Sequence, residues 1–446
     1  MNAPASGGRL LFIGGRSADG TALDVAVDPG KGTISETAPV LVPAPHDTVI
    51  DCAAMVVLAA PCEPHTHLDK ALSGAVAPNP RGDLLGAITA WHAHWPHLTH
   101  DDLVERATAA IEGMVVHGTT AIRTHVDLGV GVDLTAVRAL IAVRDEVHTR
   151  GLADVQLVAL ISVPLTGDDG REHRRLLEQA LDEGVDVVGG VPYRDPDPGE
   201  CTRLVVDAAA RRGLPIDLHT DETLDRDVVD VRHLVRLTAE RGLGGTVTAS
   251  HCVSLGAQPE EVQREVAAAL AAAGVAVVTL PQTNLYLQAR DDRVAPARGL
   301  TAVRSLLEAG ATLAAGADNV RDPFCSMGRL DALETAALLV MAAHLTPDVA
   351  WHCCTTAARR AMGLPDVSVD AGSPAELLVV EGDTLTDAIA RASDRRIVVH
   401  RGTVVATTTV KRRVLGQPAL LNTARAALRP LAPHTPAPGN VPAPLT

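Results

Sequence analysis

The chain has 446 residues, of which 46% are hydrophobic and only 2% aromatic, and its net charge is −15. This length allows one large domain with a satellite, and Ala, Val and Leu must fill the core. The acidic balance, without a long basic run, argues against nucleic acid or an anionic membrane as a partner. The apolar, uncharged stretch of residues 266–281 is shorter than the roughly 18 residues of a spanning helix.

The seven cysteines are an odd number and form no C-x-x-C pair. A chain of this size does not need disulfide bonds for stability, which favours a reducing compartment. The first residues, Met1-Asn2-Ala3-Pro4, lack the basic start and the long apolar core of a signal peptide. We therefore expect a cytoplasmic protein.

The two ends of the chain have a similar β-rich pattern. Short apolar runs broken by Gly, Asp and Pro occur near the N-terminus, as in residues 10–13, and again late in the chain, as in 396–405. Two such ends around a long middle region predict one small β-sandwich domain, formed by residues 1–54 and 370–416. Residues 417–446 form a Pro- and Ala-rich tail.

The middle region, residues 55–369, alternates apolar strands with amphipathic helices. Helices are indicated after Thr99, an N-cap followed by two acidic residues, and over residues 134–149 and 172–183. Eight strand–helix units over about 260 residues predict an α/β fold, a (β/α)₈ TIM barrel. The alternative, a doubly wound sheet, would carry a Gly-rich phosphate loop, and the sequence has no such motif. The predicted strands are residues 55–61, 119–126, 155–161, 185–191, 215–219, 246–251, 275–280 and 312–318.

Two histidines, His65 and His67, follow the first predicted strand. Side chains alternate along a strand, so both imidazoles point to the same side and make half a metal site. An isolated His-x-His is more often a pair of ordinary loop histidines. In a barrel, however, the working residues lie at the C-terminal ends of strands, where His219, His251 and Asp318 also stand. The pattern therefore predicts a metal site at this rim.

These residues belong to segments that resemble the amidohydrolase superfamily, within its bacterial cytosine deaminase-like group. The resemblance extends from about residue 10 to residue 405 and leaves out the tail. The matching segments are Glu63-Pro-His-Thr-His-Leu-Asp69, Arg123-Thr-His-Val-Asp127, His219-Thr-Asp-Glu222, Val247-Thr-Ala-Ser-His251, Asn284-Leu-Tyr-Leu-Gln-Ala-Arg290 and Asp318-Asn-Val-Arg-Asp-Pro323.

The resemblance implies one divalent metal ion, Zn or Fe, and a set of catalytic groups around it. Such an ion acidifies bound water to a pKa near ~7, and imidazole and carboxylate ligands suit both metals. Relatives with two metals have a bridging lysine or glutamate after strand four, and residues 188–193 contain neither. The implied ligands are His65, His67, His219 and Asp318. The implied catalytic residues are Asp318, which takes the proton of water, His251, which stands at that water, and Glu222, which protonates the ring nitrogen and the leaving amine.

The resemblance also implies a set of substrate contacts. Lys70 has two interpretations that we leave open: it pairs with a neighbouring carboxylate, or it faces a substrate oxygen, as in triazine-hydrolysing relatives. Cytosine deaminases carry a glutamine where an ungapped alignment places Ser162, and a tryptophan where this chain has Phe324. Triazine amine hydrolases lack a counterpart of Glu222, so the chain is more similar to the deaminases. The implied substrate contacts are Lys70, His125, Ser162, Gln288, Asn319 and Phe324.

Residues 91–97 contain three histidines that look like a second metal cluster. The polarity pattern is helical, and residues two apart on a helix do not face each other. We interpret these side chains as surface histidines near the mouth of the site. Cys252, beside His251, is interpreted as a small buried thiol.

We expect a metal-dependent hydrolytic deaminase of a small N-heterocyclic amine with a cytosine-like, pterin-like or triazine-like ring, which releases ammonia through a metal-bound hydroxide. One alternative is an amidohydrolase that cleaves a substituted amine or a cyclic amide bond of a related heterocycle. A catalytically silent scaffold protein is less favoured, because that class usually loses ligands that this chain keeps. The expected partner is a small heterocyclic substrate, with no nucleic acid and no membrane, and the chain is expected to form a homo-oligomer.

Overall fold

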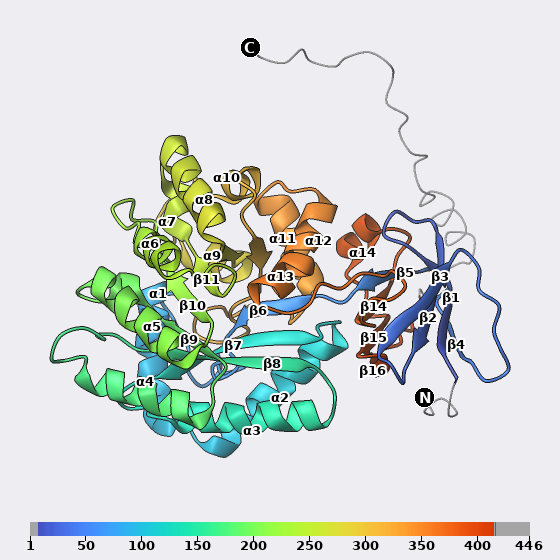
Figure 1. Cartoon of the computed structure of the whole chain (residues 1–446), viewed down its shortest axis with the longest axis horizontal. Coiled ribbons are helices and arrows are strands. Elements are labelled where there is room, and N and C mark those ends of the chain that lie inside the picture. Colours follow the sequence, from blue (N-terminus) through green and yellow to red (C-terminus); the bar gives the residue numbers. More distant parts are fainter. Residues whose placement is uncertain (1–7, 414, 416–446) are drawn as a thin grey trace, which may run out of the picture. The chain divides into compact units, whose positions relative to one another are not determined.

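A computed structural model describes residues 8–413 and 415 of the chain (Figure 1). One compact unit extends to Thr409 and contains two eight-stranded sheets. One sheet is a parallel barrel, and the other combines strands from both ends of the chain. The predicted fold class, a (β/α)₈ barrel with a small β domain from both chain ends, is confirmed. The predicted tail, residues 417–446, lies outside the described residues.

The barrel strands follow one another in the sheet in the same order as in the chain, and each pair is parallel. A parallel bridge between Thr66 and Asp318 joins the first strand to the segment after the last one. The backbone N–H of Asp318 donates to the carbonyl oxygen of His65 at 3.0 Å, which brings two predicted metal ligands side by side. The strands are β6 (Cys62–Thr66), β7 (Ala121–Leu128), β8 (Asp154–Ile161), β9 (Val187–Gly190), β10 (Ile216–Thr220), β11 (Val247–His251), β12 (Val275–Thr279) and β13 (Leu313–Ala315).

Helices connect the barrel strands, and the three helices predicted in detail are confirmed. Thr99 caps α2 (His100–Val116), because its hydroxyl accepts a hydrogen bond from the backbone N–H of Asp102. The other two are α3 (Thr135–Thr149) and α4 (Arg171–Glu183). The further helices are α1 (Leu84–His94), η1 (Trp95–His97), η2 (Pro192–Arg194), α5 (Pro198–Arg212), α6 (Val231–Arg241), α7 (Val253–Ala257), α8 (Glu260–Ala273), α9 (Pro281–Leu287), α10 (Val303–Glu308), α11 (Ala332–Ala342), α12 (Pro347–Cys354), α13 (Thr356–Ala361) and α14 (Leu385–Arg391).

The second sheet has the strand order β16-β15-β14-β5-β1-β2-β3, and β4 pairs with β1. Blue N-terminal strands and red C-terminal strands lie together in Figure 1. Buried apolar side chains such as Phe12, Leu377 and Val399 form a core of their own. The strands are β1 (Leu10–Arg16), β2 (Ala22–Asp28), β3 (Thr33–Ala38), β4 (Thr48–Asp51), β5 (Met55–Ala59), β14 (Leu377–Glu381), β15 (Arg396–His400) and β16 (Thr403–Thr407).

The prediction that residues 55–61 form the first barrel strand is wrong. Met55–Ala59 is β5, which pairs antiparallel with β14 in the second sheet. The barrel begins only at Cys62, with β6. An apolar run identifies a buried strand but does not say which of two sheets buries it. The first segment of the small domain therefore extends to Ala59.

No described helix is both long enough and apolar enough to cross a membrane.

Candidate active site

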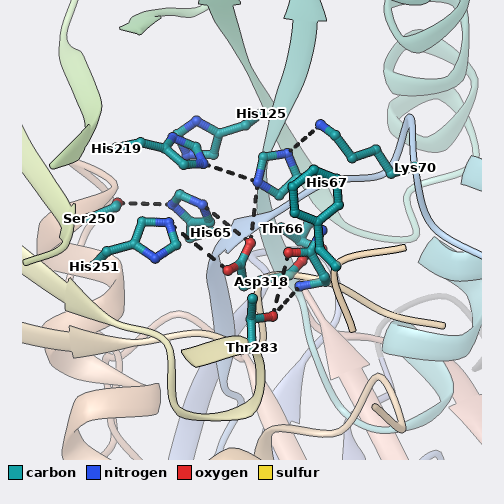
Figure 2. A network of polar contacts seen from close by, with 12 residues as sticks. His65, Thr66, His67, Lys70, His125, His219, Ser250, His251, Thr283 and Asp318 are labelled. Atoms are coloured by element: carbon teal, nitrogen blue, oxygen red, sulfur yellow. Dashed lines mark hydrogen bonds and ion pairs between the residues drawn. The ribbon is translucent and has the colours of Figure 1, made fainter. Parts of the chain in front are cut away.

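Three imidazoles, those of His65, His67 and His251, lie near the carboxylate of Asp318 at the C-terminal rim of the barrel (Figure 2). His67 Nε2 lies 3.2 Å from Asp318 Oδ1 and 3.2 Å from His219 Nε2. His65 Nε2 lies 3.6 Å from the same Asp318 oxygen. Two atoms that each sit about 2.1 Å from a tetrahedral metal are about 3.4 Å apart, so this spacing suits ligands of one ion.

Several atoms of this cluster are buried without a hydrogen-bond partner. They include His65 Nε2, His219 Nδ1, His251 Nε2 and both carboxylate oxygens of Asp318. Each unpaired buried polar group costs about 1–3 kcal/mol, whereas a cation at the centre would bind several of these lone pairs at once. The residues present therefore fit a metal ion.

The groups of side chains close enough to share an ion extend the predicted ligand set. One group joins His65 with His125 and His219, and another joins His65 with His251 and Asp318; within each group the ligand atoms lie within 4.8 Å of one another. His125 and His251 thus lie in the same cluster as the predicted ligands.

Burial sets the protonation of this cluster. Desolvation lowers the pKa of His65, His67 and His219 well below the usual range of a histidine. The imidazoles are therefore neutral, which is the form that binds a metal. Desolvation raises the pKa of Asp318 well above its usual value, so an adjacent cation would favour the ionised carboxylate.

Two residues at this rim have a left-handed backbone, which residues other than glycine rarely adopt. The φ angles are +70° at His251 and +67° at Asp318. Such strain is concentrated at functional sites, where the surrounding structure holds it in place. His251 is the last residue of β11, Asp318 lies in the segment just after β13, and both side chains line the cavity.

Glu222 follows β10 and reaches the cavity beside His251. Its Oε1 lies 3.7 Å from His251 Nδ1, and its Oε2 accepts a hydrogen bond of 3.4 Å from the hydroxyl of Tyr193. Burial raises the pKa of Glu222 to about 8, so at neutral pH the carboxyl group carries a proton that it can donate. His251 Nε2 in turn lies 4.0 Å from Asp318 Oδ2. The three predicted catalytic side chains are therefore neighbours in the order Glu222, His251, Asp318.

Lys70 forms a buried charge cluster on the cavity wall. Its Nζ lies 2.7 Å from Asp127 Oδ1, 3.6 Å from Asp69 Oδ2 and 3.1 Å from His67 Nδ1. The other oxygen of Asp127 accepts a hydrogen bond of 2.7 Å from Trp91 Nε1. Burial alone would lower the pKa of Lys70, but the two carboxylates outweigh it and raise the pKa overall. The interpretation as a carboxylate partner is confirmed, and contact with a substrate oxygen stays a prediction.

The structure places the predicted substrate contacts in three different surroundings. Lys70, Ser162, Asn319 and Phe324 line the cavity that also exposes Glu222, His251 and Asp318. His125 is fully buried, and its ring lies 3.8 Å from that of His65, centre to centre, within the metal cluster. Gln288 lines an adjoining outer hollow. The inner cavity and the outer hollow share the lining residues Leu84, Ile88, Tyr193, Arg194 and Glu222.

Comparison with known proteins agrees with this geometry. The model of the Amidohydrolase family matches residues 74–406, which is most of the chain. The chain belongs to the amidohydrolase family. The matched range contains His219, Glu222, His251 and Asp318, whereas His65 and His67 precede it. The resemblance stated from the sequence is thereby confirmed.

Individual amidohydrolases give a more detailed comparison. The chain is 33% identical over 349 residues to a pterin deaminase of Rhizobium rhizogenes, covering 76% of this chain and 78% of that protein. It is 25% identical over 372 residues to N-isopropylammelide isopropyl amidohydrolase of Pseudomonas sp., covering 80% and 87%. The crystal structure of 5-methylcytosine deaminase from Klebsiella pneumoniae liganded with 5-fluorocytosine superposes with a TM-score of 0.82 at 27% identity, covering 92% of this chain and all of that one.

Some lining residues of this amidohydrolase site were missed by sequence reasoning. Tyr193 and Arg194 lie in η2, after β9; from the sequence, Tyr193 was considered only for a metal bridge and Arg194 was not assigned a role. Asp127 stands two residues after His125 on a predicted strand end, which was a usable signal. Trp91 and His92 come from the helix whose histidines were assigned to the mouth of the site, and His92 does line the cavity. Cys252 is buried as predicted.

Proposed function

We propose that the protein is a metal-dependent hydrolytic deaminase of an amino-substituted N-heterocycle, which it converts with release of ammonia. The observation that carries this proposal is the buried carboxyl group of Glu222, 3.7 Å from His251 Nδ1, at a cavity that ends in the His/Asp cluster. The similarity to a pterin deaminase and to 5-methylcytosine deaminase supports it.

In this proposal four side chains, His65, His67, His219 and Asp318, would hold one divalent ion, zinc or iron. Such an ion, when bound, lowers the pKa of water and supplies a nucleophile at neutral pH. The described residues after β9 bring neither a lysine nor a carboxylate to the cluster, which supports a single ion. The ligand set is thus suited to hydrolysis at a carbon that bears an amino group.

The protein's own proton-transfer groups would perform the rest of the reaction. Glu222 donates its proton to the ring nitrogen next to the reacting carbon, which makes that carbon more electrophilic. The ionised carboxylate of Asp318 accepts the proton of the attacking water. The amine can depart only after protonation, because an amide anion is a very poor leaving group. Glu222, ionised by its first transfer, takes up the proton that Asp318 removed from water and delivers it to the amine, which leaves as ammonia. The remaining hydroxyl proton of the adduct returns to Glu222 as the carbonyl forms.

The cavity suggests a ring larger than cytosine. Phe324 offers an apolar ring whose centre lies 5.7 Å from Lys70 Nζ, and Asn319 adds an amide donor and acceptor. Ser162 is too short to pair with both groups of a pyrimidine amide edge, as a glutamine could. The outer hollow, which shares the lining residues Tyr193 and Arg194 with the inner cavity, offers room for a fused ring or a substituent.

A substrate panel tests the proposal. The purified, metal-loaded protein is assayed for ammonia release from pterins, cytosine, isocytosine, aminotriazines and purines, with Asp318→Ala as the control. We expect turnover of a fused or substituted ring and a kcat/KM for cytosine at least about 100-fold lower, equivalent to ~2.7 kcal/mol. If cytosine is the best substrate, the size argument is wrong; if no amine in the panel is hydrolysed, the proposed deamination is wrong.

The second candidate is cleavage of a substituted amine. The outer hollow favours it, because an N-alkyl group could extend past Tyr193 while the ring occupies the inner cavity. N-alkylaminotriazines belong in the same panel for this reason. Release of alkylamine without release of ammonia from any primary amine would support this reaction over deamination.

A further inference from the structure

A buried polar chain runs through the barrel interior behind the metal cluster. Arg123 Nη1 donates to Asp217 Oδ2 at 2.9 Å, and Ser250 Oγ donates to Asp217 Oδ1 at 2.8 Å. Ser250 Oγ also lies 2.9 Å from His65 Nδ1, as the dashed line in Figure 2 shows. All four residues are at most 1% exposed. This network of hydrogen bonds connects His65, a proposed metal ligand, to the ion pair of Arg123 and Asp217 in the core.

The directions of these hydrogen bonds follow from the number of protons. A serine hydroxyl has one proton to donate, and an ionised carboxylate only accepts. Ser250 therefore donates its hydrogen bond to Asp217. The oxygen of Ser250 must then accept from His65, which requires the proton of the neutral imidazole to be on Nδ1. His65 Nε2 is left with a free lone pair, and this is the atom 3.6 Å from Asp318 Oδ1 without a hydrogen-bond partner.

Further contacts hold Arg123, the end of the network farthest from His65, in place. Arg123 Nε donates to Gln156 Oε1 at 2.9 Å, and Gln156 Nε2 donates to the carbonyl oxygen of Met362 at 3.0 Å. Arg123 Nη1 also donates to Thr248 Oγ1 at 3.4 Å. Residues of β7, β8 and β11 therefore fix the position of Asp217 on β10, and Asp217 fixes the hydroxyl that meets His65.

We propose that Asp217 and Ser250 are positioning residues, which set the tautomer and orientation of His65 before a metal arrives and so increase metal affinity. The inference rests on the metal binding assumed in the proposed function. The other imidazoles differ: His67 Nδ1 faces the ammonium of Lys70, and His219 Nδ1 has no hydrogen-bond partner. His65 is the ligand for which a carboxylate-anchored hydroxyl selects the metal-binding form.

Ser250→Ala tests the proposal because it removes the acceptor of His65 and keeps the ion pair between Arg123 and Asp217. The matched control is Ser254→Ala, which removes a buried hydroxyl that donates to the carbonyl oxygen of Val228 and not to the metal cluster. Zn²⁺ affinity of the full chain is measured by competition with a chromophoric chelator. We expect Ser250→Ala to weaken binding about 10–100-fold, the usual effect of losing such a supporting group. Ser254→Ala should bind Zn²⁺ like the wild type.

The tautomer itself is the second readout, taken by ¹⁵N NMR of the histidines in the metal-free protein. We expect the Nδ1–H form of His65 in the wild type and in Ser254→Ala, and a mixture of tautomers in Ser250→Ala. Circular dichroism establishes that both variants are folded. Unchanged affinity with an unchanged tautomer in folded Ser250→Ala would overturn the inference, even if the enzyme deaminates a heterocycle. Conversely, the affinity loss and the tautomer change would stand even if no heterocycle in the panel were hydrolysed.

Discussion

Glu222 has the properties of a proton donor because of where its carboxyl group lies. The side chain is 6% exposed, and the resulting desolvation raises its pKa to about 8. The positive charge of Arg194 and the hydroxyl of Tyr193 act in the opposite direction and keep that pKa from rising further. A carboxylic acid with a pKa close to neutral pH can both give up and regain a proton during one turnover.

Replacement of this residue separates proton transfer from metal binding. Glu222→Gln keeps the shape of the side chain but cannot shuttle a proton, so kcat on the best substrate should fall by about 10²–10⁴-fold. Metal content by elemental analysis should be unchanged, because Glu222 lies outside the ligand cluster. Glu172→Gln, at an exposed ion pair with Arg175, is the control and should keep the wild-type rate. A Glu222→Gln enzyme with near-wild-type kcat would contradict the assignment.

Tyr193 should control the pH range of the reaction. In the proposed mechanism Glu222 acts as an acid, so kcat/KM should fall as the pH rises through its pKa. The Tyr193 hydroxyl stabilises the ionised form of Glu222, and its removal in Tyr193→Phe should raise that pKa. The alkaline limb of the kcat/KM profile should therefore move to higher pH. A limb that stays in place in Tyr193→Phe would mean that another group controls it.

Between elements, one buried ion pair connects the second sheet to the barrel helices. Arg396 of β15 donates to both oxygens of Asp331, at 2.9 and 2.6 Å, and its Nη1 also donates to the carbonyl oxygen of His117 at 2.6 Å. Asp331 is the N-cap of α11 and accepts from the backbone N–H of Leu333. The side chains of Arg396 and Asp331 are 1% and 5% exposed, so neither charge has water as an alternative partner.

Loss of this pair should destabilise the protein strongly. Asp331→Asn leaves the guanidinium of Arg396 buried without its counter-charge, and removal of one partner of a buried pair costs about 3–5 kcal/mol in the free energy of unfolding. Arg360→Gln is the control, because its pair with Asp366 is more than half exposed on both sides and should contribute less than about 1 kcal/mol. Urea unfolding of the two variants gives the comparison. Equal decreases in the free energy of unfolding of Asp331→Asn and Arg360→Gln would show that the buried pair has no special role.

The strand pattern explains why part of this site was predictable. His219, His251 and Asp318 each end or follow an apolar strand, and the ends of parallel strands meet at one rim. β6 is different, because it contains the polar residue Glu63 and the strand-disfavouring residue Pro64. The Glu63 carboxylate accepts hydrogen bonds from the backbone N–H groups of His65 and Ala317, a tertiary contact that makes a buried polar strand possible. Such a contact is invisible in the sequence, so the apolar run before it was taken for the strand.

The sequence also did not indicate how deep along the barrel axis each side chain lies. His125 and Asp127 are two residues apart on β7, so their side chains point to the same face of the strand. His125 nevertheless lies among the rings of the proposed ligands, whereas Asp127 lines the cavity wall. The strand register that decides this difference comes from pairing with neighbouring strands. Tyr193 and Arg194 lie in a short 3₁₀ turn, whose side-chain directions depend on tertiary packing.

On the scale of the whole described chain, the His/Asp cluster lies where the first barrel strand meets the segment after the last one, which is the place where the barrel closes. Thr66 Oγ1 donates to the carbonyl oxygen of Asp318 at 2.9 Å, and the backbone N–H of His67 donates to that same oxygen at 3.2 Å. An ion bound to His67, His219 and Asp318 would connect the first strand, the fifth strand and the segment after the last strand. Metal binding should therefore be coupled to the stability of the barrel.

Removal of the metal should lower the thermal unfolding midpoint of the whole barrel. A ligand that binds only the native state stabilises it by about 4 kcal/mol when present at 1,000 times its Kd. Treatment with a chelator should thus lower Tm, and one equivalent of Zn²⁺ or Fe²⁺ per chain should restore it. His65→Ala should contain little metal, and its Tm should not respond to the chelator, because the site is already lost. Elemental analysis that finds two equivalents per active chain, or a Tm that chelation leaves unchanged in the wild type, would contradict the single coupled site.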